Sequence, residues 1–159
     1  PSSIHSVRLD LNDENESTLA TRLLHSDDLV DASFVFNDEE IYYNIGVRYR
    51  GSPWGRPGDP KNFRVRFNED RPFIRGLKAV NLSRSGWAQN EGTAFHCVQS
   101  ASTASSPAPA SDYIYARVFH NTALHGQPMA IIETVDGKYL EKWFPDDGDG
   151  HVFKVAARP

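Results

Sequence analysis

The sequence predicts an α+β fold in which a mainly antiparallel sheet carries two or three short helices. Many short stretches alternate apolar and polar residues, which is the pattern of strands that bury one face. Turn-forming residues separate most of these stretches by only a few positions, as hairpin connections require. The 159 residues show no internal repeat and no clear domain break, so we expect a single domain or lobe over residues 1–159.

The chain is expected to begin with a strand and a helix. Residues 6–12 alternate, with Val7, Leu9 and Leu11 on one side, and this predicts a strand. Residues 14–26 follow, with three leucines at helical spacing and acidic residues near the start. Acidic side chains at that position interact favourably with the helix dipole, so we expect a helix there.

The later strands are recognised by the same alternation. They are expected within residues 32–51, on both sides of an acidic turn at 37–40, and at residues 63–67, 74–83, 112–119, 128–135 and 151–155. Two short helices are expected at residues 87–99 and 136–144, the second with Asp136 as its N-cap. Residues 100–111 are rich in Ser, Ala and Pro, which is typical of a loop.

The composition argues against several classes of function. The formal net charge is −4, which disfavours nonspecific binding to nucleic acid. Cys97 is the single cysteine, so neither an internal disulfide nor a cysteine-based metal cluster can form. The histidines lack the spacing of a helical metal site, and no metal ligands are predicted. No apolar run reaches about 18 residues, so no membrane span is expected.

Four arginines form the most distinctive pattern of the chain. Arg48 and Arg50 alternate with apolar residues in one predicted strand, as Arg64 and Arg66 do in the next. If the two strands pair antiparallel, all four guanidinium groups lie on the face opposite the core. Like charges at this spacing need partners, which are either carboxylates of the chain or a bound phosphate or carboxylate ligand. Both interpretations fit the sequence.

The connection between these two strands, residues 51–60, alternates three glycines with three prolines. Glycine lets backbone N–H groups approach a ligand closely, and proline stiffens a loop. The Gly-Lys-Ser/Thr ending of a phosphate-binding P-loop is missing. By composition alone the segment is therefore a long hairpin loop.

A series of short motifs runs along nearly the whole chain. Their order is "VRYRGS", "KNFRVRF", "FIRGLKAVNLS", "YARVFHNTALHGQPMAIIETVD" and "HVFKV". The positions that carry the pattern are Arg48, Arg50, Gly51, Ser52, Lys61, Phe63, Arg64, Phe67, Phe73, Gly76, Leu77, Lys78, Leu82, Asn121, Gly126, Glu133, Val135, Asp136 and Lys154. This ordered set resembles the N-terminal half of the spore coat protein H (CotH) kinase family.

The resemblance implies that the chain is the nucleotide-binding lobe of an atypical, secreted-type protein kinase, and that its fold resembles a kinase N-lobe. ATP and Mg²⁺ would be its cofactors, with the glycine-containing loop and a basic strand over the phosphates. The implied cofactor-binding residues are Arg50, Ser52, Lys61, Arg64 and Glu133. Lys61 is the first candidate for the cation that contacts phosphate, and Glu133 would lie near the adenine.

The resemblance also implies a place and a set of partners for the protein. It would be extracytoplasmic, either secreted or located on the spore or cell surface. It would transfer phosphoryl groups to Ser or Thr of a protein substrate, which requires chiefly positioning and charge neutralisation. The catalytic aspartate of such a kinase is expected beyond Lys154, in a second lobe outside this sequence, so no catalytic residue is assigned.

Two other classes of function fit the same sequence. The first is a non-catalytic binding or structural module in a surface or coat assembly, with coat or surface proteins as partners. The second is a β-rich carbohydrate-binding module unrelated to kinases. Trp54, Trp87 and Trp143 would supply protein or carbohydrate contacts in either case if they are exposed, whereas core positions are the more usual place for tryptophan. The oligomeric state is not predicted.

Overall fold

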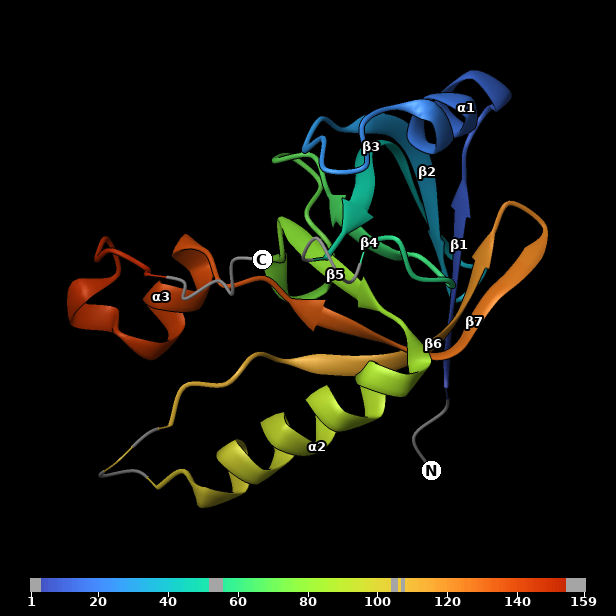
Figure 1. Cartoon of the computed structure of the whole chain (residues 1–159). Coiled ribbons are helices and arrows are strands. Elements are labelled where there is room, and N and C mark those ends of the chain that lie inside the picture. The colour runs from blue at the N-terminus through green and yellow to red at the C-terminus, as the bar shows by residue number, and fades with distance from the viewer. Residues whose placement is uncertain (1–3, 52–55, 104–105, 107, 154–159) are drawn as a thin grey trace.

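Within the described residues, seven β-strands close into a barrel with the neighbour order β1-β2-β3-β4-β5-β7-β6 (Figure 1). The computed structural model describes residues 4–51, 56–103, 106 and 108–153. The strands are β1 (His5–Asp10), β2 (Val30–Phe36), β3 (Glu40–Arg50), β4 (Asn62–Arg66), β5 (Ala79–Ser83), β6 (Tyr113–His120) and β7 (Ala123–Glu133). The helices are α1 (Asp13–Thr21), α2 (Ser85–Ala101) and α3 (Gly137–Trp143), and two 3₁₀ turns cover Ile74–Gly76 and Pro145–Asp147.

The predicted fold class is wrong in the nature of its sheet. We expected a mainly antiparallel sheet like that of a kinase N-lobe, but the sheet is closed and mixed. Closure depends on β1 and β6, which pair in parallel with Val7 opposite Val118. Alternation indicates which face of a strand is buried, but it does not indicate which distant strand lies beside it. The parallel contact that closes the barrel is therefore invisible in the local pattern.

Several predicted elements also differ from the structure at their ends. The predicted helix at 14–26 ends at Thr21, whereas the one expected at 87–99 extends over Ser85–Ala101. The strand predicted at 151–155 is not formed at residues 151–153, and the last two of its residues lie outside the described part. The shorter first helix and the missing last strand arise because helical or strand spacing continues in the sequence beyond the residues that tertiary packing holds in place.

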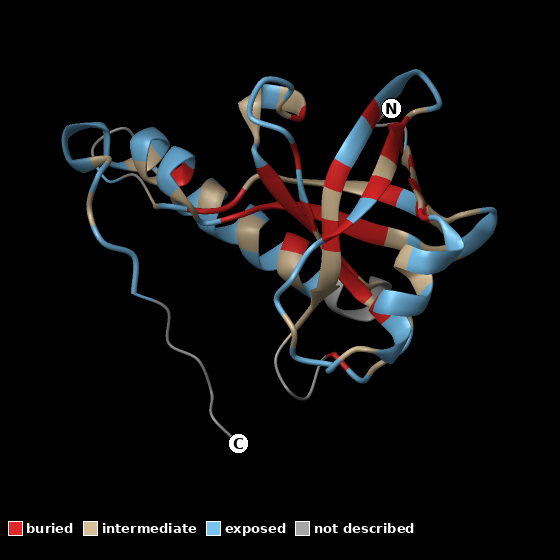
Figure 2. Cartoon of the chain, turned by 90° about the horizontal axis from the view of Figure 1, so that it is seen from above, coloured by how far each residue is buried: buried red, intermediate tan, exposed pale blue. Residues whose placement is uncertain are grey.

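The barrel interior holds the main hydrophobic core (Figure 2). Val47 of β3 and Val65 of β4 lie opposite each other and are fully buried, as the alternation predicts. The rings of Phe34, Phe67 and Phe73 pack together with centroids 5.0 to 5.4 Å apart. Aromatic side chains bury large apolar areas, so this cluster contributes strongly to the free energy of folding.

Helix α2 lies against the outer face of the barrel, along β7 (Figure 1). Ala130 and Ile132 of β7 are buried under it, and Phe95 of α2 packs against this pair together with Tyr113 and Tyr115. The helix covers only part of the outer face. The outward positions of β3, β4 and β5 that lie beside it form the candidate site described below.

Two further expectations concern the tryptophans and the membrane. Trp143 lies on α3, where its ring is 6.5 Å from that of Tyr139, and it does not belong to the barrel core. Trp54 and the side chain of Trp87 lie outside the described residues. Each described helix is too short or too polar to cross a lipid bilayer.

Candidate functional site

A cavity of about 720 Å³ opens on the outer face of β3, β4, β5 and β7, next to α2. Its volume lies in the range of pockets that bind small molecules and cofactors. Charged and polar side chains from several strands line it, and Phe95 of α2 and Ile132 of β7 add apolar surface. The cavity therefore combines ionic, hydrogen-bonding and apolar surfaces in one place.

One row of outward-facing residues crosses four strands along this cavity. Arg48 of β3 lies opposite Arg64 of β4, and Arg64 lies opposite Asn81 of β5. Asn81 in turn lies opposite Ile132 of β7. All four residues line the cavity. The register of the sheet therefore brings residues that are distant in sequence into a single line on one face of the sheet.

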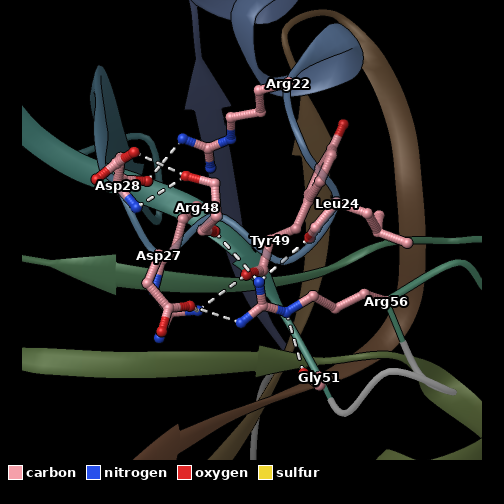
Figure 3. Close-up of polar contacts among 9 residues, drawn as sticks. Arg22, Leu24, Asp27, Asp28, Arg48, Tyr49, Gly51 and Arg56 are labelled. Carbon is pink, nitrogen blue, oxygen red and sulfur yellow. Dashed lines mark hydrogen bonds and ion pairs between the residues drawn. The ribbon is translucent and has the colours of Figure 1, made fainter.

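Asp27 supplies the carboxylate for part of the arginine group (Figure 3). Its Oδ1 lies 2.8 Å from Nη1 of Arg48 and 2.6 Å from Nη2 of Arg56. The hydrogen bond from Arg56 is the main cause that lowers the pKa of the Asp27 carboxyl, and the charge of Arg48 adds to it. The interpretation of the arginine face as salt-bridged within the chain is therefore correct for Arg48.

Arg56 fixes the loop beside the cavity rather than facing a ligand (Figure 3). Its guanidinium is buried and donates to the carbonyl oxygens of Gly51 at 3.0 Å, and of Leu24 and Ser26 at 3.2 Å each. Together with the Asp27 carboxylate, these carbonyl oxygens accept hydrogen bonds from both edges of the planar guanidinium group. Arg56 therefore joins the β3–β4 connection to the segment that precedes β2.

Arg50 and Arg64 are the cationic groups of the cavity that the chain leaves open. Among the described residues, neither guanidinium has a hydrogen-bond or ion-pair partner, although both line the cavity. Burial lowers the pKa of Arg50, Glu91 of α2 counteracts this, and the charge of Arg64 lowers it further. Two neighbouring guanidinium groups with unused donors favour an anionic ligand that accepts bidentate hydrogen bonds.

Two oxygen atoms in the same cavity lack a donor. Oδ1 of Asn81 and Oε2 of Glu91 are buried, and neither accepts a hydrogen bond from a described residue. Buried polar atoms nearly always have a partner in folded proteins, so an unsatisfied atom needs a specific explanation. Because both residues line the cavity, a ligand there is a possible source of the missing donors.

The structure separates the five residues that the sequence assigns to the site. Arg50, Arg64 and Glu133 line the cavity. Lys61 does not line it, and its Nζ donates to the carbonyl oxygens of Arg56 and Pro57, at 3.1 Å in each case. Ser52 lies outside the described residues.

Glu133 lines the cavity at the end of β7, but one of its oxygens is already engaged. Oε2 accepts from the backbone N–H of Asp112 at 3.0 Å and lies 3.3 Å from Nζ of Lys142 on α3. The Asp112 carboxylate binds the same ammonium at 2.9 Å. Burial alone would raise the pKa of Asp112, but the hydrogen bond and charge of Lys142 and those of Arg75 outweigh it, so the pKa is lowered. Glu133 therefore helps to attach α3 to the barrel.

Sequence reasoning missed Asn81, Glu91 and Asp27 as members of this group. Asn81 carried a signal, because it is a polar residue between Val80 and Leu82 in a predicted strand and so had to face outward. Nothing in the spacing of Glu91 or Asp27 relates them to the arginines, since α2 and the segment before β2 are placed by long-range packing.

The described residues do not form a magnesium site by themselves. No group of three or more His, Cys, Asp or Glu residues in the described part of the chain is arranged to hold a metal ion. Two of the carboxylates at the cavity already have cationic partners: Asp27 is bound by two arginines and Glu133 by Lys142.

No protein-family model and no curated protein matches this chain. The resemblance to the CotH kinase family stays an interpretation of the ordered motifs. The fold and the cavity are the observations on which a functional proposal has to rest.

Proposed function

We propose that the cavity beside α2 binds a phosphorylated ligand, and that this ligand is a nucleotide such as ATP. One observation carries the proposal: the guanidinium groups of Arg50 and Arg64 line the cavity, and among the described residues neither has a carboxylate within ion-pair distance. Arginine forks match the oxygens of phosphate bidentately, and such charge-assisted hydrogen bonds are the strong ones.

The rest of the cavity favours a ligand larger than a phosphate ion. Phe95 and Ile132 add apolar surface beside the arginines, and Val135, two positions after the end of β7, lines the same cavity. A nucleotide presents an anionic end and a flat apolar end, so it uses both kinds of surface. Inorganic phosphate would leave the apolar surface and most of the volume unfilled.

Phosphoryl transfer to a protein is the wider role that the CotH resemblance implies. The cavity supports this role only in its cationic groups, which would neutralise the charge of a phosphoryl donor. A non-catalytic module with a binding or structural role in a surface or coat assembly is the second candidate, and Asp27 favours it, because its carboxylate already neutralises Arg48 within the chain. The two candidates differ in what they predict for Arg64, since only ligand binding requires that its charge be left open.

Isothermal titration with ATP tests the proposal, with Arg64→Gln as the variant and Arg66→Gln as its matched control. The two arginines face the same side of β4, two positions apart, and Arg66 is exposed and does not line the cavity. Both variants remove one positive charge, so long-range electrostatic effects are equal. A lost hydrogen bond to a charged group corresponds to a fall in affinity of about 10- to 100-fold for Arg64→Gln.

The outcomes separate the candidates clearly. Binding of ATP by the wild type, weakened by Arg64→Gln and not by Arg66→Gln, supports the nucleotide site. Equal losses in the two variants would indicate nonspecific attraction to a basic surface. Absence of binding at millimolar ATP, checked by a lack of thermal stabilisation, would exclude the nucleotide and leave the non-catalytic module.

A further inference from the structure

Asn81 occupies the middle of the cavity wall and has an unmet hydrogen-bonding capacity. It is 8% exposed, lies in β5 between Arg64 and Ile132, and lines the cavity. Its Oδ1 is buried and accepts nothing from the described residues. A buried amide of this kind is costly unless a ligand or water completes it.

The chemistry of the wall changes in a fixed order along the row that contains Asn81. Two guanidinium groups, Arg48 and Arg64, are followed by the Asn81 amide and then by Ile132, against which Phe95 packs. Neighbouring strands lie about 4.8 Å apart, so the row extends over roughly 14 Å. A ligand that matches this row is anionic at one end, hydrogen-bonding in the middle and apolar at the other end.

The part of that ligand beside Asn81 must carry a donor, because Oδ1 of Asn81 is a buried acceptor without a partner among the described residues. Oε2 of Glu91 is a second buried acceptor without a donor among the described residues, and it lies in the same cavity. A carboxylate repels phosphate oxygens but accepts a hydrogen bond from a hydroxyl group. A hydroxyl group both donates and accepts hydrogen bonds. It therefore satisfies the Asn81 amide whether the oxygen or the nitrogen of that amide faces the ligand.

We propose that Asn81 is a specificity-determining residue that binds a ribose hydroxyl of the nucleotide. This inference rests on the proposed function, because it assumes that the phosphates bind at the arginine end of the row. Arg64 would then bind the phosphate, Asn81 would bind the sugar, and the base would lie against Phe95, which covers Ile132. The cavity would prefer ribonucleotides over nucleotides that lack the hydroxyl group bound by Asn81. Without that hydroxyl group, the Asn81 amide would be left unpaired in the complex.

Isothermal titration of the wild type with ATP, 2′-deoxy-ATP and 3′-deoxy-ATP tests the inference. We expect at least one deoxy analogue to bind about tenfold more weakly than ATP, as the loss of one hydrogen bond predicts. The Asn81→Leu variant replaces the amide by an apolar side chain of similar size. It should bind ATP as weakly as the wild type binds the deoxy analogue, and it should no longer distinguish the two.

Controls keep a structural effect apart from recognition of the sugar. Asn90→Leu alters an exposed asparagine of α2 that does not line the cavity, so the preference for ATP should persist there. Melting curves check that each variant is folded. If Asn81→Leu does not fold, Asn81→Ala, which adds no bulk, takes its place in the titrations. Equal loss of all three nucleotides in the Asn81 variants would show that Asn81 merely supports the sheet, and equal binding of all three by the wild type would overturn the inference.

Ribose 5-phosphate distinguishes failure of the inference from failure of the proposed function. It carries the phosphate and the hydroxyl groups but no base. If ATP does not bind and ribose 5-phosphate does, in a manner that depends on Asn81, the nucleotide proposal is wrong and the role of Asn81 holds for a sugar phosphate. If neither compound binds, both proposals are wrong.

Discussion

Arg48 lies directly opposite Arg64 across the β3–β4 ladder, yet among the described residues only Arg48 has a carboxylate partner, Asp27. Like charges at such positions repel each other, so the pair needs negative charge from outside the sheet. Asp27 forms an ion pair with Arg48 and acts on Arg64 only at longer range. The side at Arg64 and Arg50 is the part of the cavity that is available to a ligand.

Asp27 should make stability depend on pH in the acidic range. Its pKa is lowered in the folded state, so its contribution to the free energy of unfolding is present above its unfolded pKa and is lost as the pH falls through the folded pKa. Because the carboxylate is 69% exposed, we expect an effect of only about 0.5 to 1 kcal/mol. Urea unfolding at pH 7 and pH 3 measures the free energy of unfolding at the two pH values. Its decrease from pH 7 to pH 3 should be smaller for Asp27→Asn than for the wild type.

The control for this experiment is Asp31→Asn, which changes an exposed carboxylate of β2. It should keep the pH dependence of the wild type. A constant difference between Asp27→Asn and the wild type at both pH values would show that packing of the side chain matters and its ionisation does not.

Arg56 should be essential for the stability of the region beside the cavity. Arg56→Met removes the donors for three carbonyl oxygens and for Asp27, and we expect a loss of about 2 to 4 kcal/mol in the free energy of unfolding. Arg56→Lys should restore little of this, because one ammonium lacks the planar fork that reaches acceptors on two edges. Chemical denaturation of both variants measures the loss, and a near-complete recovery with lysine would refute the geometric argument.

The strands and their faces could be predicted from the sequence, while the site that they form could be predicted only in part. Val47 and Arg48 face opposite sides because a period of two is a local property of the chain. Arg56, by contrast, looks like an ordinary loop residue, and its burial depends on acceptors about 30 positions away in sequence. Contacts of that kind depend on how the segments at one end of β2 and β3 pack against each other, which the local pattern does not encode.

Gly92 should control how closely α2 approaches the barrel, and therefore the shape of the cavity. A Cβ atom at this position would collide with the hydroxyl group and ring of Tyr115 and would lie 2.9 Å from the ring of Tyr113. Gly92→Ala should therefore displace the helix, although alanine favours helix formation by about 1 kcal/mol over glycine. We expect a net loss of stability and weaker binding of ATP, measured by denaturation and titration. A more stable protein with unchanged binding would show that the rings move aside freely.

Lys61 offers the sharpest comparison between the sequence interpretation and the structure. If Lys61 were the main cation that contacts phosphate, its substitution would remove most of the affinity of the protein for ATP. The structure places its ammonium on two carbonyl oxygens of the β3–β4 connection and 5.6 Å from the ring centroid of Tyr49, away from the cavity lining. Lys61→Met should therefore lower the affinity for ATP less than Arg64→Gln does. Titration of both variants under the same conditions decides the question, and a larger loss for Lys61→Met would return the phosphate site to the glycine-containing loop.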